Sequence, residues 1–274
     1  MSWLEAIVLG LAQGLTEFLP ISSSAHVRIV PAIAGWEDPG AAFTAVIQIG
    51  TMAAVLLFFR ADLWRIATGF LASLRDRTLW RTTSHDAKLG WYIVLGTIPI
   101  SIIGFAFADQ IENEIRSLEL ISTVLILFSI VLLAADRAGK REREVDSINA
   151  RDGLMIGFAQ ALALVPGVSR SGATISFGLF RGLTRAAAAR YSFLLSVPAV
   201  VLSGAFELRH IGDEGANAGL GATAVATVVA FASGYASIAW LLRYIQRHNF
   251  NVFVIYRIGV GTVILTLALS GVIE

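Results

Sequence analysis

Long apolar stretches alternate with short charged connections along this chain of 274 residues. Several stretches approach the roughly 20 residues that an α-helix needs to cross a bilayer, and their pattern lacks the strict alternation of a transmembrane β-barrel. The pattern therefore predicts an all-α polytopic membrane protein. Six membrane-spanning helices are expected, at residues 41–59, 89–108, 118–135, 186–208, 221–242 and 250–272.

Two further apolar stretches are interrupted by polar turns. Residues 3–34 break at Pro20-Ile-Ser-Ser-Ser24, and residues 152–182 break at Pro166-Gly-Val-Ser-Arg-Ser-Gly-Ala-Thr174. The helical pieces beside each break are too short to span a bilayer, so each stretch is predicted to enter the membrane and turn back. The predicted architecture is six transmembrane helices plus two re-entrant helix hairpins.

Composition supports the membrane assignment and removes several kinds of chemistry. The chain is 56% hydrophobic and 15% charged, with a mean hydropathy of +0.72, whereas soluble domains are about 25% charged. The net charge of +1 says nothing about partners, and no basic patch typical of nucleic-acid binding is present in the sequence. The lack of cysteine excludes disulfides, thiol nucleophiles and cysteine-ligated metals. No cleavable signal peptide is expected, because Met1-Ser-Trp-Leu-Glu5 lacks a basic start.

The distribution of lysine and arginine predicts the orientation. These residues gather in the connections that follow residues 59, 135 and 242, whereas acidic residues dominate 109–119 and 210–220. Cytoplasmic loops carry the excess of positive charge, so both termini are expected outside the plasma membrane. Residues 63–74 have helical spacing of apolar side chains and are predicted to lie on the inner interface.

The two halves of the chain resemble each other. Gly10 to Pro20 parallels Gly157 to Pro166 when one residue is skipped, and a serine-rich turn follows each. Residues 1–137 and 138–274 would each contribute one hairpin and three spans, within one integral membrane domain. Because three is odd, the hairpins must enter from opposite sides, which makes an inverted-topology repeat. Their tips should meet near the midplane, where a buried wet cavity would be the default site.

The alignment makes the two tips chemically unequal. It pairs Glu17 with Leu164, and Arg170 with Ser24. A charge at membrane depth costs at least about 2.5 kcal/mol, so Arg170 is interpreted first as a functional group with an anionic partner. Its neighbours Ser169, Ser171 and Thr174 offer hydroxyls, and the start of the next helix offers free N–H groups.

This turn fits phosphate best, because planar paired donors and a helix N-terminus match several oxygens. The alternative is an N-capping loop whose arginine reaches water.

The first tip supplies groups that can break a bond. Gln13 and Glu17 are four residues apart and share a helix face, aimed at the turn with Ser22, Ser23 and His26. Glu17, with Gln13, could hold a divalent metal or act as acid or base, and His26 could take a proton from Ser23 or from water. Taken singly, Gln13 and Glu17 also fit a polar seam between helices, and an isolated histidine near a helix start is more often a structural residue. Together they indicate phosphoryl transfer.

Other polar and small residues have simpler interpretations. Gly10 and Gly14 are predicted to form a small-residue packing face rather than a phosphate loop. Arg257, inside the last span, either assists phosphate binding or extends to the interface. The residues predicted to face lipid headgroups lie near segment ends: Arg28, Arg181, Arg185, Arg190 and Glu207.

These motifs resemble a known family. Gln13-Gly-Leu-Thr-Glu17 is similar to the glutamate-or-glutamine, three residues, glutamate motif of bacterial undecaprenyl-diphosphate phosphatases of the bacitracin-resistance type. The turn from Pro166 to Thr174 resembles their second motif, and Pro20-Ile-Ser-Ser-Ser-Ala-His26 matches the serine and histidine between the motifs. The resemblance covers essentially the whole chain.

The resemblance implies hydrolysis of undecaprenyl diphosphate to the monophosphate carrier of peptidoglycan assembly, at the outer membrane face, with a divalent cation (Mg²⁺ or Ca²⁺). It implies metal-site positions at Gln13 and Glu17, a catalytic pair at Ser23 and His26, and a phosphate-binding turn containing Ser169, Arg170, Ser171 and Thr174. Some family members have glutamate at the position of Gln13, which weakens any scheme that needs two carboxylates on the metal.

Two functions from different classes follow from the sequence. One is a phosphohydrolase of a polyprenyl diphosphate lipid, in which either Ser23 or water attacks phosphorus. The other is a secondary transporter or flippase of an anionic polyprenyl lipid, because inverted re-entrant repeats are typical of transporters. Contacts with membrane lipids are expected for either function, and the chain could also form a homodimer.

Overall fold

The protein consists of helices joined by turns and short connections in the part that the computed structural model describes, which is residues 1–75, 84–107, 117–207 and 219–273. The first half contains α1 (Trp3–Phe18), α2 (Ser23–Ala34), α3 (Gly40–Phe58), α4 (Arg60–Arg75), α6 (His85–Ala106) and α8 (Leu118–Ala138). The second half contains α9 (Ala150–Ala161), α10 (Arg170–Phe180), α11 (Arg185–Glu207), α13 (Leu220–Tyr244) and α14 (Asn251–Leu269). Two short 3-10 turns, η1 (Val145–Ser147) and η2 (Leu162–Leu164), precede and follow α9.

Apolar periodicity located each described helix to within a few residues. Five helices, α6, α8, α11, α13 and α14, are long and apolar enough to cross a membrane. A sixth span results if α3 and α4, which meet at a bend of 80°, count as one. The prediction of an all-α, multi-pass membrane protein is therefore confirmed. The acidic connections used to predict orientation fall mostly on residues 109–116 and 210–218, outside the described residues.

The two broken hairpins begin and turn in the same way. Both α1 and α9 start with a capping box, at Ser2 and Asn149. Both α2 and α10 follow a serine with a left-handed backbone, Ser22 at φ 76° and Ser169 at φ 71°. The spacing between equivalent residues is 147 in both cases. The repeat therefore needs no skipped residue, which corrects the sequence alignment: Arg170 corresponds to Ser23 rather than to Ser24.

Close backbone approaches hold the hairpins against the longer helices. Helix α1 packs along α13, and α9 packs along α6 in the same manner. A Cβ atom added at Gly10 would lie 2.4 Å from the carbonyl oxygen of Ala226, and one added at Gly157 would lie 2.4 Å from that of Gly96. A Cβ added at Gly14 would also collide with α13. The predicted small-residue packing face is thus confirmed, because glycine alone permits these crossings.

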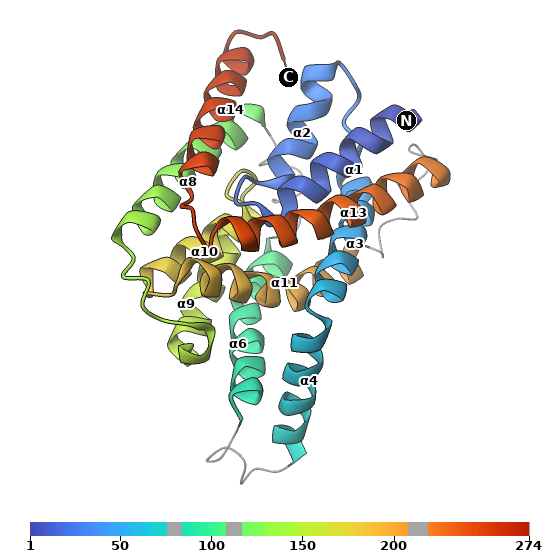
Figure 1. The fold of residues 1–274 in the computed structure, drawn as a ribbon. Helices are drawn as coiled ribbons and strands as arrows, with labels where there is room; N and C mark the ends of the chain where they lie inside the picture. Colours follow the sequence, from blue (N-terminus) through green and yellow to red (C-terminus); the bar gives the residue numbers. More distant parts are fainter. Residues whose placement is uncertain (76–83, 108–116, 208–218, 274) are drawn as a thin grey trace.

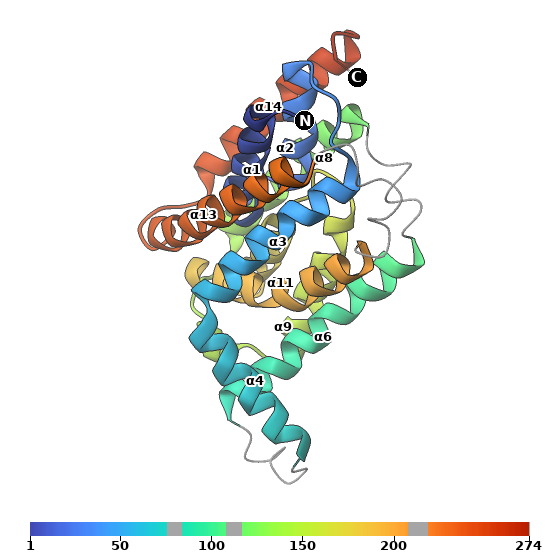
Figure 2. The same ribbon diagram turned by 90° about the vertical axis from the view of Figure 1, so that its right-hand side faces the viewer.

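The ends of the bundle are easy to recognise in two views. Both termini lie at one end in Figure 1, and α4 reaches furthest toward the other end. Figure 2 shows α4 beside α6 at that far end, where the two helices pack together. Trp64 and Leu71 on α4 remain exposed, as expected for the predicted interfacial helix.

Four arginines predicted to face headgroups instead form ion pairs within the protein. Arg181 lies 2.7 Å from Asp152, Arg185 lies 2.6 Å from Asp136, and Arg190 lies 2.6 Å from Asp62. The carboxylates of Asp136 and Asp152 are buried, so each needs a cation to offset its desolvation. The sequence shows that these arginines lie near helix ends, but it does not show which carboxylates they pair with. Arg28 lies 3.4 Å from Asp38, and the side chain of Glu207 lies outside the described residues.

Candidate active site

The tips of the two hairpins meet at a cavity of about 580 Å³. Its wall has a polar part and an apolar part. The polar part combines Gln13, Glu17, Ser22, Ser23 and Ser24 from the first hairpin with Ser169 and Arg170 from the second, and with Gln48 from α3. The apolar part is formed by Ile100, Phe105, Leu164, Ala199 and Leu202. The cavity therefore suits a molecule with a polar head and an apolar body.

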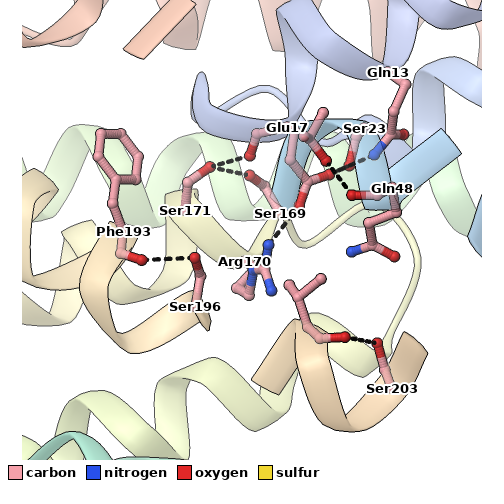
Figure 3. A network of polar contacts seen from close by, with 12 residues as sticks. Gln13, Glu17, Ser23, Gln48, Ser169, Arg170, Ser171, Phe193, Ser196 and Ser203 are labelled. Carbon is pink, nitrogen blue, oxygen red and sulfur yellow. Dashed lines mark hydrogen bonds and ion pairs between the residues drawn. The ribbon is translucent and has the colours of Figure 1, made fainter. Parts of the chain in front are cut away.

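Glu17 is the centre of the polar part (Figure 3). Its Oε1 atom lies 2.5 Å from Nη2 of Arg170. Its Oε2 atom accepts hydrogen bonds from Ser23 Oγ at 2.6 Å and from Gln13 Nε2 at 2.9 Å. The structure thus brings together four residues that the sequence singled out, over a separation of more than 150 positions. Because Arg170 pairs with Glu17, it does not reach for water as the alternative interpretation required.

Serine side chains organise both turns. Ser169 caps α10, since its Oγ accepts the N–H of Gly172 at 3.1 Å. Ser171 Oγ donates to the carbonyl oxygen of Leu19 at 3.0 Å, so it links the second tip to the end of α1. The hydroxyls of Ser169 and Ser171 are 3.2 Å apart, and those of Ser22 and Ser24 are also 3.2 Å apart. Ser22 and Ser169 line the cavity, whereas Ser171 is buried behind it.

His26 does not contact Ser23. Its Nδ1 lies 2.7 Å from the carbonyl oxygen of Ser22, and its Nε2 lies 2.8 Å from the hydroxyl of Tyr256. Because a carbonyl only accepts, Nδ1 carries the proton, and Nε2 accepts from Tyr256. The predicted pair of Ser23 and His26 is therefore not formed. Spacing placed both residues on one helix face, but the Ser23 hydroxyl donates its hydrogen bond to the carboxylate of Glu17 and His26 points to α14.

Thr174 and Arg257 also lie outside the cavity lining. Thr174 is buried, and its hydroxyl bonds to Ser192 at 2.6 Å and to the carbonyl oxygen of Arg170 at 2.8 Å. Thr174 thus supports the start of α10 from behind. A direct contact between Thr174 and phosphate stays a prediction.

Arg257 is fully buried and neither faces the cavity nor reaches the interface. Its Nη1 atom donates to the carbonyl oxygen of Pro20 at 3.0 Å, and its Nη2 atom donates to that of Gly167 at 3.0 Å. Its Nε atom donates to Ser129 Oγ at 3.0 Å. The guanidinium therefore joins the two hairpin turns through their backbones. This position differs from both sequence interpretations, which considered the charge and not the carbonyl groups freed by the broken helices.

Two residues near the site were missed by sequence reasoning. Gln48 is an amide within the apolar helix α3, and Tyr256 precedes Arg257 on α14. A polar side chain inside a predicted span is a functional signal in itself, so Gln48 could have been found. No sequence signal pairs Tyr256 with His26, which is 230 positions away.

The donors at the site fit a divalent cation only together with a substrate. Among the described residues, no group of three or more histidine, cysteine, aspartate or glutamate side chains could hold a metal. Glu17 is the carboxylate of the cavity, and Oε1 of Gln13 is buried without a hydrogen-bond partner in the described residues. Mg²⁺ commonly takes one or two protein oxygens and fills its other positions with phosphate oxygens and water. Gln13 and Glu17 match that requirement.

The comparisons with known proteins agree over the whole chain. The family model described as "Bacitracin resistance protein BacA" matches residues 6–263. The undecaprenyl-diphosphatase of Nocardioides sp. is 54% identical over 274 residues, covering 100% of this chain and 99% of the relative. Undecaprenyl-diphosphatase 2 of Streptomyces avermitilis is 50% identical, covering 100% and 97%. The undecaprenyl-diphosphatase of Thermobifida fusca is 52% identical, covering 100% and 92%. This chain belongs to the BacA family of bacitracin resistance proteins.

Proposed function

We propose that this protein is an undecaprenyl-diphosphatase, which hydrolyses the membrane lipid undecaprenyl diphosphate to undecaprenyl phosphate and inorganic phosphate. That reaction returns the lipid carrier to peptidoglycan synthesis and accounts for bacitracin resistance. The observation that carries the proposal is the cluster of Glu17, Ser23 and Arg170 at the junction of two hairpin tips. It combines a hydroxyl, a carboxylate and a cation beside an apolar wall, as a lipid diphosphate requires.

Arg170 binds the terminal phosphate and thereby releases Oε1 of Glu17. In the free protein the guanidinium is paired with Glu17. A phosphate with two negative charges competes for the same cation, and paired coplanar donors favour it. When Arg170 turns to the phosphate, it frees Oε1 of Glu17, while Oε2 keeps the hydrogen bond from Ser23. The N–H groups at the start of α10 and the hydroxyl of Ser169 lie beside the same phosphate position.

Ser23 is the nucleophile, and Glu17 is its base. The 2.6 Å hydrogen bond from Ser23 Oγ to Glu17 Oε2 is already the path of the proton. The bond from Ser23 Oγ to the terminal phosphorus forms as the bond from phosphorus to the bridging oxygen breaks. The electron pair leaves with undecaprenyl phosphate. Water then displaces Ser23 from phosphorus, Glu17 returns the proton to Ser23 Oγ, and both protons of water stay on inorganic phosphate.

His26 acts on this reaction as a positioning residue. Its Nδ1–H holds the carbonyl oxygen of Ser22, whose left-handed backbone starts the turn that presents Ser23. A non-glycine residue in that conformation is strained by about 1–3 kcal/mol and persists only when neighbours fix it. His26 and its partner Tyr256 supply that restraint.

A divalent cation, Mg²⁺ or Ca²⁺, would be held by Gln13 and Glu17 together with phosphate oxygens of the substrate. When bound, it would neutralise the charge of the diphosphate and of its transition state. Gln13 Oε1 is buried and has no hydrogen-bond partner among the described residues, which supports this assignment.

The arrangement in the membrane follows an inverted repeat of residues 1–137 and 138–274, each with a re-entrant hairpin and three spans. Equivalent capping boxes, left-handed serines and glycine contacts support this proposal. Both termini lie outside, and the cavity opens to the outer face of the plasma membrane. The position of both termini at one end of the bundle is consistent with this orientation. The homodimer stays a prediction.

The test is release of inorganic phosphate by the purified protein in detergent. With a polyprenyl diphosphate and Mg²⁺ or Ca²⁺, the protein should release phosphate at a rate proportional to its concentration. Glu17→Gln is the matched control, because it keeps the size of the side chain and removes the base. If no phosphate is released under any divalent cation, while the protein binds or moves the lipid, the transporter alternative is correct.

A further inference from the structure

Gln48 is a polar side chain of the cavity that the mechanism above does not use. It lies on α3, one helical turn after Thr44, and both residues line the cavity. In Figure 3 it appears beside the Glu17–Ser23 pair, between that pair and Ser203 on the other side of the view. Helix α3 is otherwise strongly apolar around this position.

The amide of Gln48 is also free of protein partners. Other polar side chains of the lining are engaged: Thr44 donates to the carbonyl oxygen of Gly40 at 2.9 Å, and Ser101 donates to that of Thr97 at 2.9 Å. Among the described polar side chains that line the cavity, the amide of Gln48 alone makes no hydrogen bond. A primary amide offers two donors and an acceptor, and its transfer from water without partners costs several kcal/mol. A half-buried amide in a membrane cavity is therefore available to a ligand.

We propose that Gln48 binds the inner phosphate of the lipid diphosphate, the one that leaves with the lipid. This inference rests on the proposed function. In the proposed mechanism, Arg170, Ser169 and the start of α10 bind the outer phosphate, and the lipid chain contacts the apolar wall of the cavity. The inner phosphate must lie between those two regions, in the same cavity that Gln48 lines. The amide then donates to a phosphate oxygen that stays on the leaving group, and contributes affinity rather than chemistry.

The two products of the reaction separate the two phosphate positions experimentally. Farnesyl monophosphate competes for the inner phosphate position, and inorganic phosphate competes for the outer one. For Gln48→Met, which keeps the length of the side chain, we expect KM for farnesyl diphosphate and Ki for farnesyl monophosphate to rise about tenfold. Such a change corresponds to about 1.4 kcal/mol. Ki for inorganic phosphate and kcat should stay within about twofold of the wild-type values.

Ser101→Ala is the matched control, because Ser101 lines the same cavity with its hydroxyl already bonded to its own helix. It should leave all three constants within about twofold. If Gln48→Met fails to fold, as judged by its thermal transition, Gln48→Glu serves instead. Its carboxylate should repel the inner phosphate and raise the same two constants more than tenfold.

Unchanged constants for farnesyl diphosphate and farnesyl monophosphate in the variant would overturn the inference, as would a larger Ki for inorganic phosphate alone. If the wild type itself released no phosphate, the proposed function would fail and not only the role of Gln48.

Discussion

The two hairpin tips share a backbone but carry different chemistry. In each tip the second helix follows a serine with a left-handed backbone, Ser22 or Ser169. The hydroxyl of that serine lies 3.2 Å from the hydroxyl of the serine two positions later. At the position between, one tip has Ser23 and the other has Arg170. The two hairpins thus have the same turn geometry. A hydroxyl at one copy and a guanidinium at the other then meet on the single carboxylate of Glu17.

The different side chains of the two tips explain why one charged pair suffices in this cavity. A symmetric pair of arginines would repel, and a symmetric pair of serines would leave the phosphate without a counter-charge. Because the carboxylate comes from the first tip and the cation from the second, the free site is neutral and its desolvation cost is reduced. Substitutions that remove the distinguishing group of each tip should have larger effects than substitutions that remove the contacts holding the tips together.

Ser23→Ala should have the largest effect, because it removes the proposed nucleophile of the first tip. We expect kcat for phosphate release to fall by more than about 10³-fold with little change in protein stability. If water attacked phosphorus directly, the loss of one hydrogen bond would instead leave on the order of 1–10% of the activity. Steady-state phosphate release, with Ser24→Ala as the neighbouring control, separates the two results.

Arg170→Ala should lower kcat/KM by about 10²-fold or more, since it removes the charge-assisted clamp of the second tip. Arg170→Lys should restore little, because an ammonium group cannot offer two coplanar donors. The measurement is kcat/KM for a polyprenyl diphosphate in detergent. Near-normal activity of the lysine variant would reduce Arg170 to a general electrostatic role.

Much of this contrast was visible in the sequence. Apolar periodicity located the helices, and the broken segments identified Glu17, Ser23 and Arg170, because charged and polar residues are costly at membrane depth. Side-chain direction was not visible. His26 turns to Tyr256, Thr174 to Ser192, and Arg257 to backbone carbonyl groups.

The contacts of His26 and Arg257 join segments more than 200 positions apart, and that of Thr174 joins α10 to the next helix, so no local spacing encodes them. The register of the repeat was also missed by one residue. Alignment on the two prolines, Pro20 and Pro166, required a gap, whereas the capping residues that set the helix starts require none.

Arg257→Met should reduce stability, because Arg257 holds the carbonyl oxygens of both tips. Its removal leaves buried acceptors without donors, at about 1–3 kcal/mol each. We expect a fall of several degrees in the Tm of the detergent-solubilised protein, together with lower activity. Lys140→Met, at an exposed position in a connecting loop, is the control. An unchanged Tm in Arg257→Met would show that the tips do not depend on this residue.

Tyr256→Phe should have the smallest effect, because it removes one hydrogen bond to His26 and keeps the stacked ring. We expect kcat to fall about threefold to tenfold at an unchanged KM, since the contact orders the turn and does not touch the substrate. His26→Ala should be worse, because it also frees the carbonyl oxygen of Ser22. Equal activity of Tyr256→Phe and wild type would show that this hydrogen bond does not order the turn.

The most direct test of the central claim is to trap the intermediate on the first tip. Wild-type protein is mixed with polyprenyl diphosphate labelled in its terminal phosphate, quenched in acid within one turnover and digested for peptide analysis. The account predicts labelled phosphoserine at Ser23, which is absent from Ser23→Ala and strongly reduced in Arg170→Ala. Rapid turnover without label at Ser23, together with substantial activity of Ser23→Ala, would contradict it.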